Sequence, residues 1–197
     1  MLRALRFASV LRLDRVLLAT GSVHSFTELF KGFDRNEAVR KIFGDRTEEV
    51  LRNLKVELTW VGGYMWVNSR NGHLMVSSSY LNEGDRVDIY LDVIHELVHV
   101  RQLMEGKELF DPQYSYVERP TEIEAYRYTV EEARRIRLDD NEITKYLKTE
   151  WMTDEELEQL AKTLGVQCDS NKQGERKTTP KSNNEDRVKT HEAVSSA

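Results

Sequence analysis

This chain contains a single cysteine, Cys168, among its 197 residues. One cysteine cannot form an intramolecular disulfide, so the fold must be held by a packed core, and nothing in the cysteine content points to secretion. A zinc ribbon is also excluded, because such a ribbon needs several thiolates. We therefore expect a soluble cytoplasmic domain, in which Cys168 is an exposed, inert thiol.

Long apolar runs are also missing. Arginines at positions 3, 6, 12 and 15 interrupt the apolar residues of the first twenty positions. Neither a secretory signal of the usual length nor a membrane span of roughly 20 residues is predicted. The pattern is that of a basic amphipathic helix. Packing on the domain, contact with an anionic membrane surface and organelle targeting all remain open for it, although Asp14 argues against targeting.

The charge pattern gives no support to nucleic-acid binding. The net charge is −5, and no stripe of lysine and arginine alternates with aromatic residues. From Cys168 to Ala197 the few apolar residues are scattered among polar ones, so we expect a disordered tail and do not expect His191 to be a ligand. The chain is thus divided into an N-terminal helical segment (1–54), a central domain (55–165) and a tail (166–197).

The hydrophobic period changes along the first part of the folded region. Apolar residues recur at helical spacing between positions 25 and 54, and then alternate with polar ones from Lys55 to Trp60. A strand is predicted at 64–67. The Asn71-Gly72 turn signal precedes another strand at 74–79. These strands form a small, mainly antiparallel sheet in which we expect 74–79 to be the edge, and Trp60 and Trp66 to pack on the sheet or in the core.

The most informative stretch of the chain is His95-Glu96-Leu97-Val98-His99. It lies in an apolar segment from Val87 to Met104 without glycine or proline, which predicts a buried helix that begins after a capping Asp85. On a helix the two imidazoles share one face, where both can bind one metal ion while Glu96 lies beside them. The alternative is a pair of core histidines bonded to backbone carbonyls.

A second helix is predicted from about Pro120 to Arg137, since proline suits its first turn and acidic residues favour its N-terminal end. Glu122 and Glu124 both lie in this first part. They are about 200° apart around the helix, so both cannot face one metal ion. They can also serve only as charges at the helix N-terminus. Two further helices are predicted at 142–148 and 154–164, the latter capped by Thr153 and ended by Gly165.

The pair of segments His95–His99 and Thr121–Tyr126 resembles the gluzincin class of zinc metallopeptidases, and in size is similar to small ImmA/IrrE-like or minimal zincin proteins. The resemblance covers about fifty residues, roughly 87–137, and implies a zincin-like α+β fold. It implies that zinc is held by His95, His99 and Glu122, with Glu124 as the alternative third ligand. Many gluzincins have Asp or Asn where this chain has Tyr126, so either the tyrosine hydroxyl or a different group is expected to accept from the ring N–H of the first histidine.

The resemblance also implies an activity, the hydrolysis of peptide bonds in a peptide or protein substrate. Glu96 would act as general base toward water and then as general acid toward the leaving amine. Tyr114 or Tyr116, from the loop between the two helices, would stabilise the oxyanion, or else only anchor the loop. A non-catalytic, zinc-stabilised protein-binding module and a zinc hydrolase of non-peptide amides remain as alternatives. The sequence does not indicate an oligomeric state.

Overall fold

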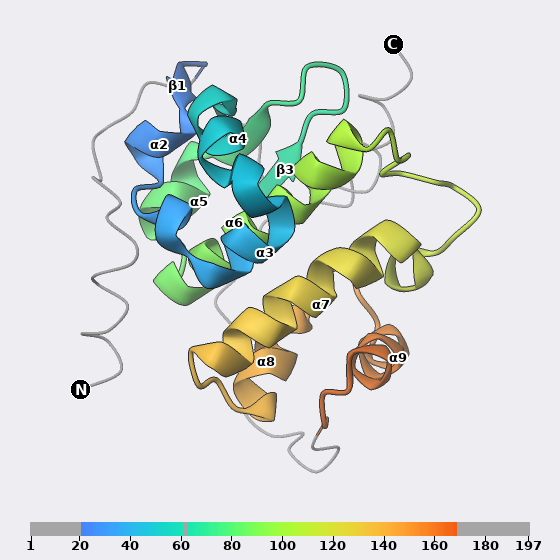
Figure 1. The fold of residues 1–197 in the computed structure, drawn as a ribbon. Coiled ribbons are helices and arrows are strands. Elements are labelled where there is room, and N and C mark those ends of the chain that lie inside the picture. Colours follow the sequence, from blue (N-terminus) through green and yellow to red (C-terminus); the bar gives the residue numbers. More distant parts are fainter. Residues whose placement is uncertain (1–20, 61–62, 169–197) are drawn as a thin grey trace.

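The computed structural model describes residues 21–60 and 63–168, and these form an α+β structure (Figure 1). The predicted N-terminal amphipathic helix and the predicted tail beyond Cys168 lie outside the described residues. The elements, in chain order, are β1 (Val23–Ser25), α2 (Phe26–Leu29), α3 (Glu37–Phe43), α4 (Thr47–Asn53), β2 (Lys55–Thr59), β3 (Met65–Val67), β4 (Leu74–Ser77), α5 (Ser78–Glu83), α6 (Arg86–Met104), α7 (Pro120–Arg135), α8 (Asp140–Leu147) and α9 (Asp154–Leu164).

The sheet is mixed, with strand order β1-β2-β4-β3. β1 and β3 run antiparallel to their neighbours, whereas β2 and β4 pair in parallel. The prediction that 74–79 is the edge strand is wrong, because β4 pairs on both sides and leaves β3 at the edge. The strand also ends early. The side chain of Ser77 caps α5 by accepting from the backbone N–H of Tyr80, so the chain turns into a helix there.

The short strand β1 is a feature that the sequence pattern did not reveal. Its three residues pair with the first three residues of β2, from Ser25 opposite Lys55 to Val23 opposite Glu57. Three residues are too few to establish an alternating pattern, so only the pairing with β2 identifies this segment as a strand. The helical character predicted for the rest of the segment up to 54 is confirmed by α2, α3 and α4.

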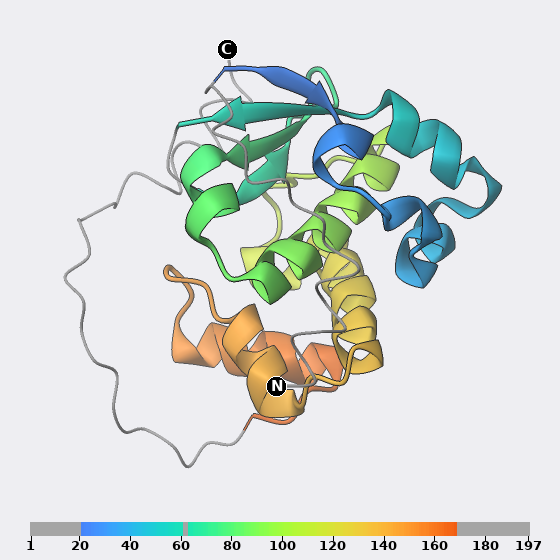
Figure 2. The same ribbon diagram turned by 90° about the vertical axis from the view of Figure 1, so that its left-hand side faces the viewer.

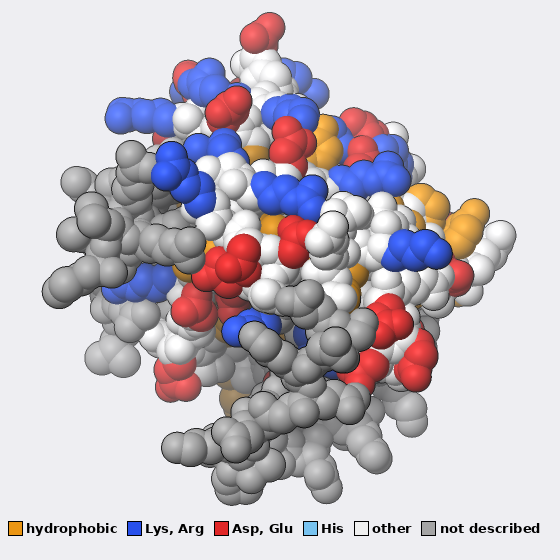
Figure 3. Space-filling model, turned by 90° about the horizontal axis from the view of Figure 1, so that it is seen from below, with side chains coloured by type: hydrophobic (Ala, Val, Ile, Leu, Met, Phe, Trp, Pro, Cys, Tyr) orange, Lys and Arg blue, Asp and Glu red, His pale blue; other side chains and the backbone are white. Residues whose placement is uncertain are grey.

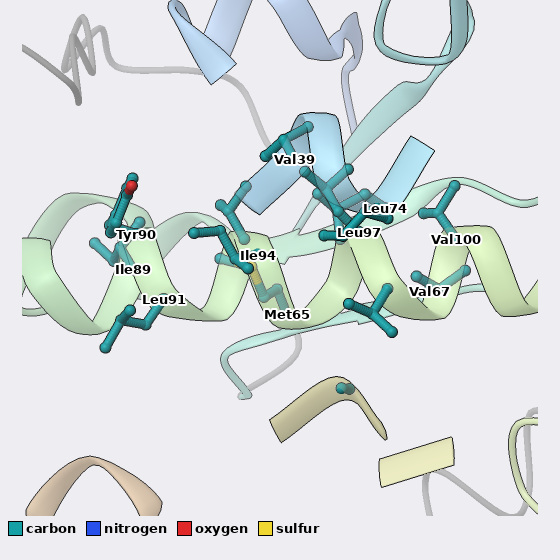
Figure 4. Close-up of a cluster of buried hydrophobic side chains, with 14 of the residues drawn as sticks. Val39, Met65, Val67, Leu74, Ile89, Tyr90, Leu91, Ile94, Leu97 and Val100 are labelled. Carbon is teal, nitrogen blue, oxygen red and sulfur yellow. The ribbon is translucent and has the colours of Figure 1, made fainter. Parts of the chain in front are cut away.

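Helix α6 forms the centre of the molecule, and its predicted extent is confirmed. Asp85 caps it by accepting from the backbone N–H groups of Val87 and Asp88, and the chain leaves it at Gly106 with a φ of 74°. Its apolar side chains are buried in a single core with residues of the sheet and of α3, some of which are labelled in Figure 4. Because α6 is buried nearly all round, its polar residues must find partners inside the protein.

The N-terminal helices share this core. Phe26, Phe30 and Phe33 stack edgewise or tilted on one another, and the ring of Phe33 lies 5.5 Å from that of Tyr90 on α6. Beside them, the hydroxyl of Tyr90 donates to the buried carboxylate of Glu132 on α7. The segment before β2 therefore packs directly against the helix that carries the two histidines.

Helices α7, α8 and α9 lie on the side of α6 away from the sheet (Figure 2). The predicted cap of α9 is confirmed: Thr153 and Glu156 bond reciprocally, and Gly165 ends the helix in the left-handed region. Among the described residues, every helix is too short or too polar to cross a bilayer. On the face seen in Figure 3, lysine and arginine side chains alternate with acidic ones.

Candidate metal centre

Two packed helices bring the predicted metal ligands together. His95 and His99 lie one turn apart on α6, and Glu122 lies in the first turn of α7. Because backbone N–H groups point outward at a helix N-terminus, this position favours a carboxylate. All three side chains are between 5% and 6% exposed, so the group is almost removed from water.

The three candidate ligand atoms form a small triangle. Nε2 of His95 lies 3.0 Å from Nε2 of His99 and 3.2 Å from Oε2 of Glu122, and Nε2 of His99 lies 3.5 Å from the same oxygen. Ligand atoms arranged tetrahedrally around a zinc ion at about 2.0–2.1 Å are about 3.3 Å apart. The triangle therefore has the dimensions of three corners of such a site.

Glu96 completes the cluster from the same helix. His95, Glu96 and His99 each offer a ligand atom within 4.8 Å of the others, so this buried group could hold a metal ion. The backbone N–H of Val67, in β3, donates to the carboxylate of Glu96. The Oε2 atom of Glu96 is buried without a hydrogen-bond partner among the described residues. An unpartnered carboxylate oxygen beside three converging ligand atoms is costly unless something binds there.

Glu124, the alternative third ligand, faces a different set of residues. Its carboxylate accepts hydrogen bonds from Arg101 at 2.5 Å, from Gln102 at 2.9 Å and from Lys107 at 3.1 Å. Residues two positions apart on a helix are rotated by about 200° from each other, which explains why Glu122 faces the histidines and Glu124 does not. Of the two glutamates, the structure places Glu122 in the triangle.

The expected partner of the first histidine is absent from its position. The hydroxyl of Tyr126 lies 2.8 Å from that of Tyr116, and the Tyr126 ring packs against His95 with centroids 4.5 Å apart. Nδ1 of His95 is buried and has no hydrogen-bond partner among the described residues. Neither the hydroxyl of Tyr126 nor another group of the described residues therefore accepts from this nitrogen, and ring packing orients His95 instead.

Gln102 is a site residue that sequence reasoning missed. Its Oε1 lies 2.8 Å from Nδ1 of His99, and its amide nitrogen donates to the backbone carbonyl of Thr121. A usable signal was present in the sequence: a glutamine three residues after His99 on an apolar helix lies on the same face as the imidazole. A buried amide in such a place needs partners, and the nearest polar group was the histidine.

The two tyrosines proposed for the oxyanion differ in position. Tyr114 is 43% exposed and turned to solvent. The hydroxyl of Tyr116 lies near enough to the site to respond to its charges: burial raises its pKa most, and the carboxylates of Glu122 and Glu96 raise it further.

Two predictions outside the site are corrected by the structure. Trp60 is 86% exposed, so the prediction that it packs on the sheet or in the core is wrong. Cys168 is half-buried against the core rather than exposed.

The titratable groups of the cluster are strongly coupled. Burial alone would lower the pKa of His99, but the carboxylates of Glu122 and Glu96 raise it to about 9. Burial alone would raise the pKa of Glu122, but the two imidazoles lower it well below its usual range. Burial raises the pKa of Glu96 to about 8, and the carboxylates of Glu122 and Asp92 add to this effect. A proton held among these groups competes with a cation for the same positions.

A second carboxylate lies one turn before Glu96 on α6. Asp92 accepts hydrogen bonds from the hydroxyls of Tyr80 at 2.6 Å and of Tyr146 at 2.8 Å. Burial raises its pKa to about 6, an effect that the two hydroxyls reduce. These bonds join α5 and α8 to α6, about one turn before the metal cluster. The sequence pattern gave no indication of this link, because the three residues come from three separate segments.

Comparison of the chain with protein-family models, with curated proteins and with solved structures finds no match.

Proposed function

We propose that this protein is a zinc-dependent metallopeptidase with a zincin-like fold, in which His95, His99 and Glu122 hold the metal ion. The observation that carries the proposal is the triangle of two imidazole nitrogens and one carboxylate oxygen, 3.0–3.5 Å apart, beside the unpartnered oxygen of Glu96. These side chains converge from two helices that only the fold brings together. The order of sheet, histidine helix and glutamate helix agrees with the gluzincin resemblance of the sequence.

The donor set favours zinc. Two imidazole nitrogens and one carboxylate oxygen are a common set for catalytic zinc, whereas magnesium and calcium favour all-oxygen sites. Three protein ligands leave one coordination position for water or substrate. A zinc ion bound here would lower the pKa of water and polarise a substrate carbonyl. A structural zinc site is usually closed by a fourth protein ligand. Glu96 offers a carboxylate oxygen within reach of the triangle, and in this proposal that oxygen faces the water instead of the ion.

Glu96 would handle the proton. Its carboxylate takes the proton from the attacking water and passes it to the leaving amine, which requires a group that can exist in both states near neutral pH. Burial has the required direction, since it raises the pKa of Glu96 toward that range. Because Glu96 is held by the N–H of Val67 in β3, its position is fixed relative to the sheet.

The edge strand β3 would receive the substrate. The N–H of Asn68 donates to the carbonyl of His73 and the N–H of Ser77 donates to that of Tyr64, so the alternation of an antiparallel pair turns the backbone of Met65 and Val67 away from β4. Because the N–H of Val67 already donates to Glu96, a substrate would pair with the N–H and carbonyl of Met65 and with the carbonyl of Val67. An extended peptide can add to such an edge through main-chain hydrogen bonds. The edge that the sequence pattern placed at 74–79 is β3 in the structure, and the proposal therefore uses β3.

The first experiment measures metal content and hydrolysis together. Purified wild type should contain about one zinc per chain by mass spectrometry, and His99→Ala and Glu122→Gln should lose most of it. Glu131→Gln is the matched control, since it makes the same change on the same helix at a surface ion pair with Lys41. Absence of zinc from wild type after purification without chelators and addition of zinc would overturn the proposal.

Glu96→Gln separates catalysis from metal binding. This variant should retain zinc and lose hydrolysis of a peptide library by a factor of at least about a hundred, which is the usual size of a general-base contribution. A zinc-stabilised binding module would show no hydrolysis in wild type. A hydrolase of non-peptide amides would leave the peptides intact and cleave small amides in a manner that depends on Glu96.

A further inference from the structure

Gln102 is fully buried and contacts both segments that carry the candidate ligands. On α6 its Oε1 lies 2.8 Å from Nδ1 of His99. On α7 its Nε2 lies 3.0 Å from the carbonyl of Thr121, the residue immediately before Glu122, and 2.9 Å from the carboxylate of Glu124. A single amide thus joins the second histidine to the N-terminal turn of the glutamate helix.

The orientation of this amide follows from its partners. A backbone carbonyl and a carboxylate accept hydrogen bonds and cannot donate them, so the atom of Gln102 that faces Thr121 and Glu124 must be the NH₂ group. The oxygen must then face His99, where it can only accept. Nδ1 of His99 therefore carries the proton, and in the neutral imidazole Nε2 presents its lone pair to His95 and Glu122.

We propose that Gln102 is a positioning residue that fixes His99 in the Nδ1–H form required for metal binding, and that Glu124 orients Gln102 for this task. The inference rests on the proposed function, since it assigns these two residues to the same zinc site. Partners of ligand imidazoles commonly affect metal affinity without touching the ion. Glu124 thereby gains a role outside the ligand triangle.

The charges around Glu124 support this role. Arg101 donates to the Oε1 atom of Glu124, and Lys107 donates to Oε2, the oxygen that also accepts from Gln102. Arg101 donates in addition to the hydroxyl of Tyr128. These contacts hold the carboxylate of Glu124 in place independently of Gln102. A fixed acceptor leaves the amide one orientation, in which the glutamine oxygen cannot exchange places with the nitrogen.

The test measures zinc affinity by competition with a chromophoric chelator, in wild type and in Gln102→Leu. We expect the leucine variant to bind zinc about 10–100-fold more weakly, the usual effect of removing such a partner. Gln159→Leu is the matched control, because it makes the same change at an exposed residue of α9 whose side-chain amide donates to Glu118. It should bind zinc as wild type does.

A role exchange distinguishes positioning from packing. Gln102→Glu keeps an acceptor for His99 but faces the Glu124 carboxylate, so it should also bind zinc weakly. The double variant Gln102→Glu/Glu124→Gln restores one donor and one acceptor between residues 102 and 124, although the carbonyl of Thr121 still faces a carboxylate. It should therefore bind zinc at least about threefold more tightly than Gln102→Glu without reaching the affinity of wild type. A double variant as weak as Gln102→Glu would overturn the proposed pairing.

A spectroscopic readout tests the tautomer directly. In zinc-loaded protein labelled with ¹⁵N-histidine, the Nδ1–H of His99 should give a slowly exchanging resonance that broadens or shifts in Gln102→Leu. Tight zinc binding in both proteins with an unchanged resonance would overturn the role of Gln102 and leave the metal site standing. Failure of wild type to bind zinc would instead overturn the proposed function, so the two failures are distinguishable.

Discussion

Zinc should stabilise the folded protein by an amount that depends on Glu122. His99 and Glu122 belong to different helices and meet only in the folded chain, so the unfolded chain offers zinc no comparable site. A ligand at a hundred times its dissociation constant adds about 2.7 kcal/mol to the free energy of unfolding. For a domain of this size, such an increment corresponds to a rise in melting temperature of roughly 5–11 °C.

Glu122→Gln should remove most of this rise, because a neutral amide is a poor replacement for a carboxylate ligand. Glu122→Gln should also change how the free energy of unfolding of the metal-free protein depends on pH. The pKa of His99 is raised from 6.5 to about 9 on folding, so its contribution is fully present below pH 6.5 and is lost as the pH rises through 9. The gap corresponds to at most about 3 kcal/mol, of which Glu122 provides a large part.

Thermal and urea unfolding with and without zinc, monitored by circular dichroism, would measure both effects. Without zinc, Glu122→Gln should be less stable than wild type at pH 6 and should approach it at pH 10. Glu131→Gln, the surface control, should follow wild type throughout, since exposed pairs contribute about 0–1 kcal/mol. Equal zinc-induced shifts in wild type and Glu122→Gln would refute the assignment of the third ligand.

Two further predictions concern groups outside the ligand triangle. Folding raises the pKa of Asp92 from 3.8 to about 6, so the free energy of unfolding of wild type should fall by up to about 3 kcal/mol as the pH rises from 4 to 6. Asp92→Asn should lack this fall when both proteins are measured by urea unfolding. Parallel pH profiles of the two proteins would contradict the prediction. Asn36 caps α3 and donates to the hydroxyl of Tyr90, so Asn36→Ala should lower the free energy of unfolding by about 2–4 kcal/mol. Asp139→Ala, which removes an exposed cap, should lower it by only about 1 kcal/mol. Equal losses would show that the buried bond contributes nothing.

Local signals in the chain were sufficient for the long helices, although not for α5, whose first residues had been predicted as strand. Asp85 and Thr153 are caps of the expected kind, and the apolar spacing between them and the next glycine defined α6 and α9. Such signals act within one or two turns, so no other part of the chain can alter them easily. The same holds for the pairing of His95 with His99, whose common face is a property of the helix alone.

The sheet could not be read in the same way. Residues 74–77 have a strand pattern, but whether they lie at an edge depends on which strands flank them. β2 pairs with β4 rather than with β3, its neighbour in sequence. This pairing leaves Met65–Val67 at one edge of the sheet. Strand order is set by packing between segments far apart in sequence, which a pattern within one segment does not contain.

The sequence by itself determined the α+β class, the helix that carries His95, Glu96 and His99, and two candidate glutamates on a second helix. Only the tertiary structure placed Glu122 at 3.2 Å and 3.5 Å from the two imidazoles and bound Glu124 to Arg101. It also brought Gln102 to His99 and Thr121, and Asp92 to two tyrosines. The physical reason is that helical periodicity fixes which residues share a face, whereas the distance between faces of different elements arises only when those elements pack.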